Sequence, residues 1–322
     1  MITAKDLRGV LAIMPTPAKE GADRLDATNT VDLEETARLA ESLVRDGATG
    51  IMALGTMGEC ATTAPSDYEA FVDCLVKTVR GRIPTFVGTT TLSGHETARR
   101  IKFAKSLGAT GTLLGIPMWQ PATLDMAVKF YADVAQAFPD FPIMVYANPR
   151  AFRFAFDVDF WGPIVEKAPT VMSAKFSSKN ILKKVVEAVK GRVNLVPPVG
   201  LAYEFAQMSP DSQTTCWIPA VGPQVGLALM KALAARDAQQ AKGVADDIAW
   251  ANEPHHVMTG SQDIFASYNI QMEKILMSAS GYCKTGPIRP PYNVMPDDFR
   301  KAATEGGQRY AKLREKYSKA LG

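Results

Sequence analysis

Short apolar runs alternate with amphipathic segments along roughly the first 235 residues of the chain. Each run is nearly continuous in apolar residues and is followed by glycine, proline or polar residues, which is typical of buried parallel strands. We therefore expect strands at 9–14, 50–54, 85–88, 111–114, 143–146, 171–176, 193–196 and 215–218.

The segments between these runs repeat apolar residues at helical spacing, as Leu33, Ala37, Ala40 and Val44 do. Pro65 and Thr123 are suited to the starts of two of these helices, and Gly47 to the end of another. The expected helices are 32–46, 65–79, 94–107, 123–137, 160–167, 181–190, 201–208 and 226–235.

Eight successive strand–helix units predict a closed (β/α)₈ barrel, a TIM barrel, over residues 1–236. A doubly wound open sheet is the alternative, but no G-x-G-x-x-G follows the first strand. Residues 237–322 show helical patterns only, at 237–251, 264–280 and 297–321, without a low-complexity linker. We expect this C-terminal helical extension to pack on the barrel.

The composition is that of an ordinary soluble protein, with 47% hydrophobic and 21% charged residues in 322. The 36 basic and 33 acidic residues leave a net charge of only +3, so neither a nucleic acid nor an anionic membrane is an expected partner. The start of the chain lacks a signal-peptide pattern, and no apolar stretch reaches the ~20 residues of a membrane span. The four cysteines show no C-x-x-C spacing, which indicates reduced thiols and a cytoplasmic protein.

In a barrel of this kind the active site lies at the carboxyl ends of the strands. This rule selects candidates from the second, fourth, fifth, sixth and eighth strands: Thr56, Glu59, Trp119, Tyr146, Asn148, Lys175 and Trp217. Lys175 has the apolar neighbours Ala174 and Phe176, and desolvation lowers the pKa of a lysine, which allows a neutral amine to form a Schiff base with a ketone. The alternative is a strand-end lysine whose amine reaches solvent.

Tyr146 is expected to end the strand beside that of Lys175, where a phenol could transfer protons to a bound substrate or simply pack at the strand end. The two Trp side chains could form an aromatic floor for a flat substrate, or belong to the core.

Gly55-Thr56-Met57-Gly58-Glu59 lies between a strand and a helix. Two glycines could turn backbone N–H groups inward and form a nest for a carboxylate, although an ordinary tight turn is the alternative. The adjacent His255 and His256 do not share a helix face, and we interpret both as surface residues rather than metal ligands. The low histidine count argues against an imidazole-based zinc site, while carboxylate-bound Mg²⁺ stays open.

Together, Gly55-Thr56-x-Gly58-Glu59, Tyr146-x-Asn148-Pro149 and Lys175, 29 residues after the tyrosine, resemble a known family. The chain is similar over its whole length to the Schiff-base-forming class I pyruvate aldolases of the dihydrodipicolinate synthase and N-acetylneuraminate lyase superfamily. Within it, the chain looks most like the benzylidenepyruvate hydratase-aldolases of aromatic hydrocarbon breakdown. That similarity is carried by the segments 14–17, 58–62, 117–120, 146–149 and 289–293.

The resemblance implies a mechanism and a set of roles. The pyruvoyl carboxylate would bind the nest at Thr56 and Met57, Lys175 would form the imine, Tyr146 would transfer protons, and Asn148 would position water or the carbinol. Because the imine is the electron sink, no metal or organic cofactor is expected. The products would be an aromatic aldehyde and pyruvate, and the enzyme a homotetramer.

Two departures from the synthases argue against a role in lysine biosynthesis. Met57 replaces the second threonine of their Thr-Thr pair, and Met118-Trp119 replaces a Tyr-Tyr pair, which puts their intersubunit tyrosine relay in doubt. Trp119 instead offers an apolar face for an aromatic ring.

Arg150 follows Asn148-Pro149 and could pair with an ortho-carboxylate on the ring. The loop 198–201 carries no acid that would repel such a group, so 2′-carboxybenzylidenepyruvate is favoured over the 2′-hydroxy compound. Two alternatives remain: a related lyase or synthase for sugar acids or semialdehydes, and a non-catalytic ligand-binding barrel.

Overall fold

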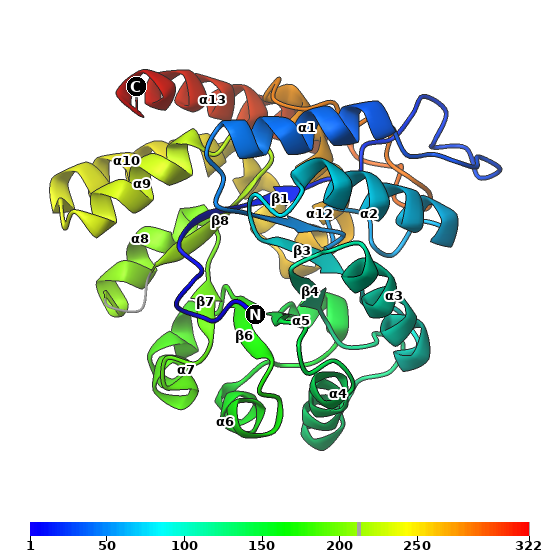
Figure 1. Cartoon of the computed structure of the whole chain (residues 1–322). Helices are drawn as coiled ribbons and strands as arrows, with labels where there is room; N and C mark the ends of the chain where they lie inside the picture. Colours follow the sequence, from blue (N-terminus) through cyan, green and yellow to red (C-terminus); the bar gives the residue numbers. More distant parts are fainter. Residues whose placement is uncertain (211–213, 322) are drawn as a thin grey trace.

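Eight parallel strands form a nearly closed barrel in a computed structural model that describes residues 1–210 and 214–321 (Figure 1). The strands pair in the order β7-β6-β5-β4-β3-β2-β1-β8, and a parallel bridge between Pro198 and Trp217 links the two ends of the sheet. Every residue of β2 to β5 is buried, as the continuous apolar runs predict. The strands are β1 Gly9–Met14, β2 Gly50–Ala53, β3 Thr85–Gly88, β4 Gly111–Leu114, β5 Ile143–Tyr146, β6 Val171–Lys175, β7 Asn194–Val196 and β8 Thr215–Pro219.

A ring of helices surrounds the barrel, so the predicted (β/α)₈ fold is confirmed (Figure 1). The side chains of Asp32 and Thr123 accept hydrogen bonds from the first turns of α1 and α4, which sets where these helices begin. The helices of the ring are α1 Leu33–Arg45, α2 Pro65–Val79, α3 Gly94–Ser106, α4 Leu124–Ala137, α6 Val158–Lys167, α7 Leu182–Val189, α8 Val199–Met208 and α9 Gln224–Ala234.

The C-terminal segment consists of the helices α10 Ala238–Asn252, α11 His256–Thr259, α12 Gln262–Ala279 and α13 Asp297–Leu321. In Figure 1, α13 runs along one side of the barrel, and α12 lies behind β1 and β3. Buried side chains of α10 and α13 belong to the same hydrophobic core as the strands, so the extension packs on the barrel. A domain boundary at residue 236 stays a prediction.

Four short elements are absent from the sequence-based expectation: α5 Pro149–Phe152, α11, and the 3₁₀ turns η1 Lys179–Ile181 and η2 Glu253–His255. Helices of one turn are too short to show apolar periodicity, and only tertiary contacts stabilise them. In α5, Phe152 packs where a Cβ at Gly115 would stand, and its ring lies 5.2 Å from that of Tyr146. This helix therefore holds a strand-end side chain in place.

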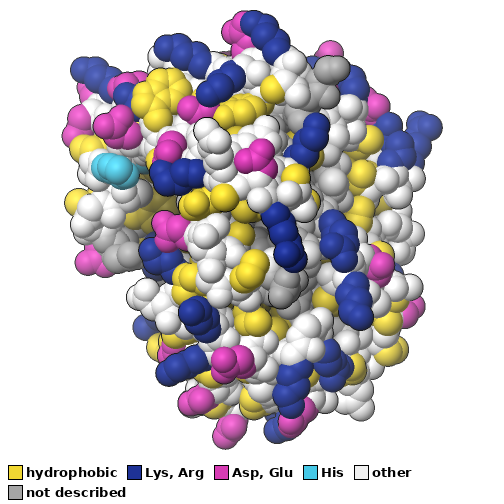
Figure 2. Space-filling view, turned by 90° about the vertical axis from the view of Figure 1, so that its left-hand side faces the viewer, with side chains coloured by type: hydrophobic (Ala, Val, Ile, Leu, Met, Phe, Trp, Pro, Cys, Tyr) yellow, Lys and Arg dark blue, Asp and Glu magenta, His cyan; other side chains and the backbone are white. Residues whose placement is uncertain are grey.

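The surface carries charges of both signs. On the face seen in Figure 2, Lys and Arg side chains are interspersed with Asp and Glu. No helix in the described part of the chain is long and apolar enough to cross a membrane.

Candidate active site

A cavity of about 600 Å³ opens where the strands β5, β6 and β8 end. Its wall combines strand-end residues with side chains from the C-terminal helices. Six of the residues predicted from the sequence line it: Met57, Tyr146, Asn148, Arg150, Lys175 and Trp217.

Lys175 and Tyr146 stand side by side because of an irregularity in their strands. The register between β5 and β6 shifts after Ile143, which pairs with Val171, so that Met144 pairs with Ser173 and Tyr146 with Lys175. Without this bulge, Tyr146 would lie opposite Ala174. An extra residue in one strand re-aims the side chains beyond it, and here it brings phenol and amine to the same position of neighbouring strands.

The Lys175 amine lies between two aromatic rings. Its Nζ is 4.5 Å from the ring centre of Tyr146 and 4.2 Å from that of Trp217. Trp217 Nε1 is buried and has no hydrogen-bond partner among the described residues. A buried donor without a partner is costly, so this N–H is available to an acceptor on a bound molecule.

The Tyr146 hydroxyl is at the centre of a hydrogen-bond cluster. Tyr146 Oη lies 2.8 Å from Thr56 Oγ1, 3.4 Å from Asn148 Nδ2 and 3.5 Å from the backbone N of Thr56. Burial by itself raises the pKa of this phenol, but the charge of Lys175 and the hydrogen bonds from Thr56 and Asn148 outweigh it and lower the pKa below its ordinary value. The side chain is therefore suited to exchanging protons beside the lysine.

The Gly55–Glu59 segment is a compact turn between β2 and α2. Two of its N–H groups bond within the turn, Gly58 N to Gly55 O at 3.1 Å and Glu59 N to Thr56 O at 2.9 Å. The N–H of Met57 donates to no other described residue, and Met57 lines the cavity. The Met57 N–H therefore has no acceptor among the described residues, which is compatible with a nest for an anion.

Three residues selected from the sequence do not line the cavity: Thr56, Glu59 and Trp119. Thr56 is hydrogen-bonded to Tyr146, which does line the cavity. Trp119 is 77% exposed, and Arg153 Nη1 donates to its backbone oxygen at 2.8 Å. The expectation of an aromatic floor shared by Trp119 and Trp217 is wrong within one chain, because a residue five positions beyond a strand end can point away from the barrel mouth.

The C-terminal helices supply cavity residues that the sequence analysis missed. Glu273 of α12 is 8% exposed, and its Oε2 has no hydrogen-bond partner in the described part of the chain. Burial raises the pKa of this carboxyl to about 7, although the charge of Lys175 opposes the shift. Asn269, one helical turn earlier, and Tyr310 of α13 line the same cavity. The signal in the sequence is a charged pair, Glu273-Lys274, inside an apolar stretch of helix.

The interpretation of both histidines as surface residues is wrong for His255. Its side chain is 5% exposed and packs against Gly306, where a larger residue would overlap it. Burial, together with the charges of His256 and Arg309, lowers the pKa of His255 to about 4, so the imidazole is neutral at pH 7. Both histidines line the cavity, but no group of three or more His, Cys, Asp or Glu side chains among the described residues could hold a metal ion.

Arg150 lies at the cavity wall as predicted. It is the second residue of α5, and its guanidinium stands 4.4 Å from the ring centre of Phe265. Burial lowers the pKa of Arg150 below its ordinary value, as expected for a partly desolvated cation. Arg150 and Glu273 thus line the same cavity, and only Arg150 is predictable from its position after a strand end.

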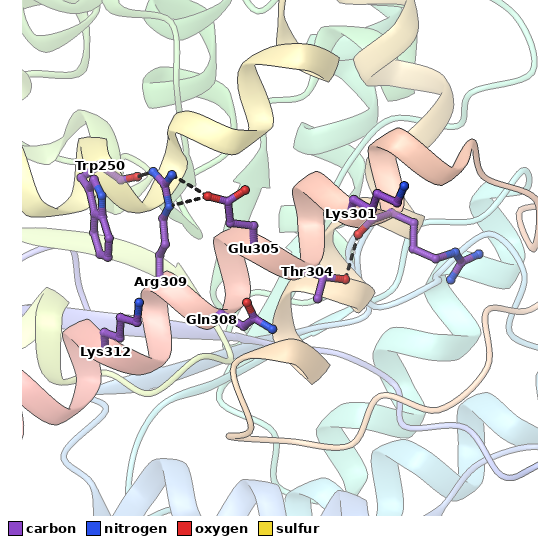
Figure 3. A pocket seen from close by; sticks show the side chains of 8 residues that line it. Trp250, Lys301, Thr304, Glu305, Gln308, Arg309 and Lys312 are labelled. Atoms are coloured by element: carbon purple, nitrogen blue, oxygen red, sulfur yellow. Dashed lines mark hydrogen bonds and ion pairs between the residues drawn. The ribbon is translucent and has the colours of Figure 1, made fainter.

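A second hollow, of about 700 Å³, lies on the outer face of α10 and α13 (Figure 3). Arg309 bonds to Glu305 and to the backbone oxygen of Trp250 there, and its guanidinium lies 5.0 Å from the Trp250 ring centre. None of the strand-end candidates lines this hollow, so it is not part of the candidate active site.

The Dihydrodipicolinate synthetase family matches residues 7–305 of the chain. The trans-O-hydroxybenzylidenepyruvate hydratase-aldolase of Pseudomonas aeruginosa is 39% identical over 326 residues, covering 99% of this chain and 97% of the relative. The trans-2'-carboxybenzalpyruvate hydratase-aldolase of Nocardioides sp. (strain KP7) is 34% identical, covering 99% and 98%. A solved structure, PhdJ bound to substrate intermediate, matches with a TM-score of 0.94 at 35% identity, over 98% of this chain and 99% of that one.

A barrel with a lysine and a tyrosine paired at its carboxyl end defines the class of protein, and the chain belongs to the dihydrodipicolinate synthetase family. The relatives at 34% to 39% identity are named hydratase-aldolases, which are lyases. The prediction that this chain is an enzyme of that type is confirmed.

Proposed function

We propose that the enzyme hydrates and cleaves a trans-o-substituted benzylidenepyruvate, giving an aromatic aldehyde and pyruvate through a Schiff base on Lys175. The observation that carries this proposal is the pairing of Lys175 with Tyr146 in one register, where both side chains line the cavity. The names of the two kinds of relative support the substrate class.

The first step places the substrate's 2-oxo acid end at Lys175. Its carboxylate accepts hydrogen bonds from the turn at Thr56 and Met57, and the Lys175 amine attacks the 2-oxo carbon. The carbonyl oxygen takes up protons and leaves as water, and an imine forms. Tyr146 Oη, held by Thr56 and Asn148, is placed to pass these protons.

The protonated imine withdraws electrons from the conjugated double bond, so water adds at the benzylic carbon. Asn148 positions this water. Tyr146 then removes the proton of the new hydroxyl group. The bond that breaks joins the benzylic carbon to the carbon next to the imine carbon. The aldehyde leaves, and the remaining enamine is protonated and hydrolysed to pyruvate, which frees Lys175. The imine is the electron sink, so these residues carry the whole sequence without a cofactor.

The proposal is tested by borohydride reduction in the presence of pyruvate, followed by peptide mass spectrometry. We expect a reduced pyruvoyl adduct on Lys175 alone, because reduction traps an imine that the lysine has formed. Turnover of a benzylidenepyruvate without any adduct at Lys175 would show that the chemistry runs by another route.

The ring substituent depends on two opposite charges in the cavity. Arg150 favours a 2′-carboxylate, which was the basis of the sequence-based preference. Glu273, which the sequence analysis did not place there, disfavours a second carboxylate and can accept a hydrogen bond from a hydroxyl group. Because the Oε2 atom of Glu273 has no hydrogen-bond partner among the described residues, we propose the 2′-hydroxy compound as the preferred substrate, with the 2′-carboxy compound next.

Glu273→Gln should reverse or erase this preference. In the wild type, kcat/KM for the 2′-carboxy substrate relative to the 2′-hydroxy substrate is expected to fall as pH rises from 6 to 8, because the Glu273 carboxyl loses its proton near pH 7. In Glu273→Gln the ratio should be independent of pH and at least about tenfold higher at pH 8, since the like-charge repulsion is gone.

The matched control is Arg150→Gln, which should change the same ratio in the opposite direction by removing the cation. An unchanged ratio at pH 8 in Glu273→Gln would show that Glu273 does not face the ring substituent.

The homotetramer implied by the family resemblance stays a prediction. We propose that a second copy covers the face around Trp119, because Trp119, Leu92 and Met126 follow the neighbouring strands β3 and β4 and are all largely exposed. A light-scattering mass equal to the 34.8 kDa of one chain would contradict this.

A further inference from the structure

A network of buried charges lies behind the Gly55–Glu59 turn. Glu59 and Lys274 have fully buried side chains, and that of Arg289 is 3% exposed. Glu59 Oε2 accepts hydrogen bonds from Lys274 Nζ at 2.7 Å and from Arg289 Nη1, and Glu59 Oε1 accepts one from the backbone N of Arg289 at 2.8 Å. Each oxygen of the carboxylate is thus compensated by donors on the C-terminal segment.

The network continues from Arg289 to α2. Arg289 Nε donates to Thr30 Oγ1 at 2.8 Å, and Thr30 Oγ1 donates to Asp67 Oδ2 at 2.6 Å. Asp67 is 3% exposed, so two acids and two bases are buried together and their formal charges cancel. Such a buried network is weak evidence for stability, because well-packed apolar residues in its place often stabilise a fold equally well. Its value to this protein must therefore come from the geometry that it imposes.

One consequence of that geometry concerns the turn that faces the substrate carboxylate. Glu59 has a φ of 57°, in the left-handed region that is uncommon for residues other than glycine. Its side-chain bonds hold it there. Thr16 Oγ1 also donates to Gly58 O at 2.7 Å, and Arg289 Nη1 donates to Thr16 O at 3.1 Å. The Arg289 guanidinium thus fixes two neighbouring residues of the turn: it binds Glu59 directly and reaches Gly58 through Thr16.

A second consequence concerns α12. Lys274 Nζ also donates to Pro287 O at 2.7 Å. Lys274 therefore connects α12 both to the Gly55–Glu59 turn and to the segment of the chain that follows α12. The residues just before Lys274, Met272 and Glu273, line the cavity. Because side chains of adjacent residues point in different directions, fixing Lys274 on Glu59 sets which face of α12 meets the substrate.

We propose that Lys274 and Arg289 are positioning residues of the reaction. Through Glu59 they hold the turn in the shape that binds the substrate's carboxylate, and Lys274 also holds α12, whose Met272 and Glu273 line the cavity. This inference rests on the proposed function, since it assumes that a 2-oxo acid binds at the turn. A purely structural network would change stability without changing which ligand groups the enzyme recognises.

The test compares pyruvate with methyl pyruvate, which carries the same ketone but no carboxylate charge. For each ligand, the concentration that gives half-maximal borohydride trapping on Lys175 is measured. Lys274→Met should raise this concentration about tenfold for pyruvate, because displacement of a binding group by a fraction of an ångström is costly, and less than threefold for the ester. The matched control, Lys242→Met, removes an exposed partner of Asp246 on α10 and should change neither value.

Thr16→Val is a second variant that leaves all four buried charges in place and removes only the bond to Gly58 O. Thr16→Val should raise the pyruvate concentration for half-maximal trapping severalfold and leave that for methyl pyruvate unchanged. The inference is overturned if Lys274→Met and Thr16→Val change the trapping of both ligands equally, or change neither. The proposed function would still stand in that case, provided that the wild-type enzyme forms the pyruvate adduct at Lys175. If the wild-type enzyme forms no adduct with pyruvate at Lys175, the proposed function and this inference both fall.

Discussion

Lys175→Met is expected to abolish turnover of benzylidenepyruvates, with a loss in kcat on the order of 10⁴- to 10⁶-fold, as when other covalent nucleophiles are removed. Methionine keeps the unbranched side chain beside the rings of Tyr146 and Trp217 but cannot form an imine. Without the imine there is no electron sink for hydration or for carbon–carbon cleavage. The measurement is the loss of absorbance of the conjugated substrate, together with borohydride trapping.

Lys179 offers a matched control four residues along the chain. Its amine pairs with Glu204 at 2.6 Å on the surface, and its side chain is about half exposed. Lys179→Met should keep both turnover and the Lys175 adduct, because exposed ion pairs contribute little. Activity above about a hundredth of wild type in Lys175→Met would contradict a covalent role for this lysine, since no residual route of that efficiency is expected.

Tyr146→Phe is expected to lower kcat/KM by about 10²- to 10⁴-fold, the usual contribution of a positioned acid or base. Phenylalanine keeps the edge-to-face contact with Phe152, so the cavity wall stays in place. It removes the hydroxyl that Thr56 and Asn148 hold next to Lys175. The measurement is steady-state cleavage across pH, in which the wild-type enzyme should show an ionisation below pH 10 that the variant lacks, because Lys175 and the two hydrogen bonds lower the pKa of Tyr146.

Tyr131→Phe controls for the loss of a buried hydroxyl. Tyr131 Oη donates to Leu114 O at 2.7 Å in the outer part of the barrel wall. Its removal should cost about 1 kcal/mol of stability and leave kcat/KM unchanged. If Tyr146→Phe behaves like Tyr131→Phe, the phenol takes no part in proton transfer.

Much of the fold is predictable from local patterns. The strands at 9–14, 85–88, 111–114 and 143–146 have the predicted bounds, because a buried parallel strand must be apolar along its whole length. The helix ends were also close, since caps such as Asp32 and Thr123 act within one turn. Four-residue elements such as α5 were missed because they depend on contacts like that of Phe152 with Gly115.

The residues of the candidate site also fall into two groups: those predictable from the sequence and those that only the folded structure places there. Lys175, Tyr146, Asn148 and Trp217 were selected because the fold alone brings strand ends together. Glu273 could not be selected by that rule, because it reaches the cavity only when α12 folds back over the barrel. The same placement changes the expected ring substituent, since the preference for a 2′-carboxylate rested on Arg150 and on a loop, 198–201, without an acid.

The sequence by itself determined the alternation of strands and helices, the barrel, and the strand ends that carry the lysine and the tyrosine, because each of these follows from apolar periodicity and local capping. Only the tertiary structure decided that a bulge brings Tyr146 level with Lys175, that Trp119 is exposed and does not line the cavity, and that Glu59 binds Lys274 and Arg289. These features depend on contacts between residues as many as 230 positions apart, and no local pattern encodes such a pairing.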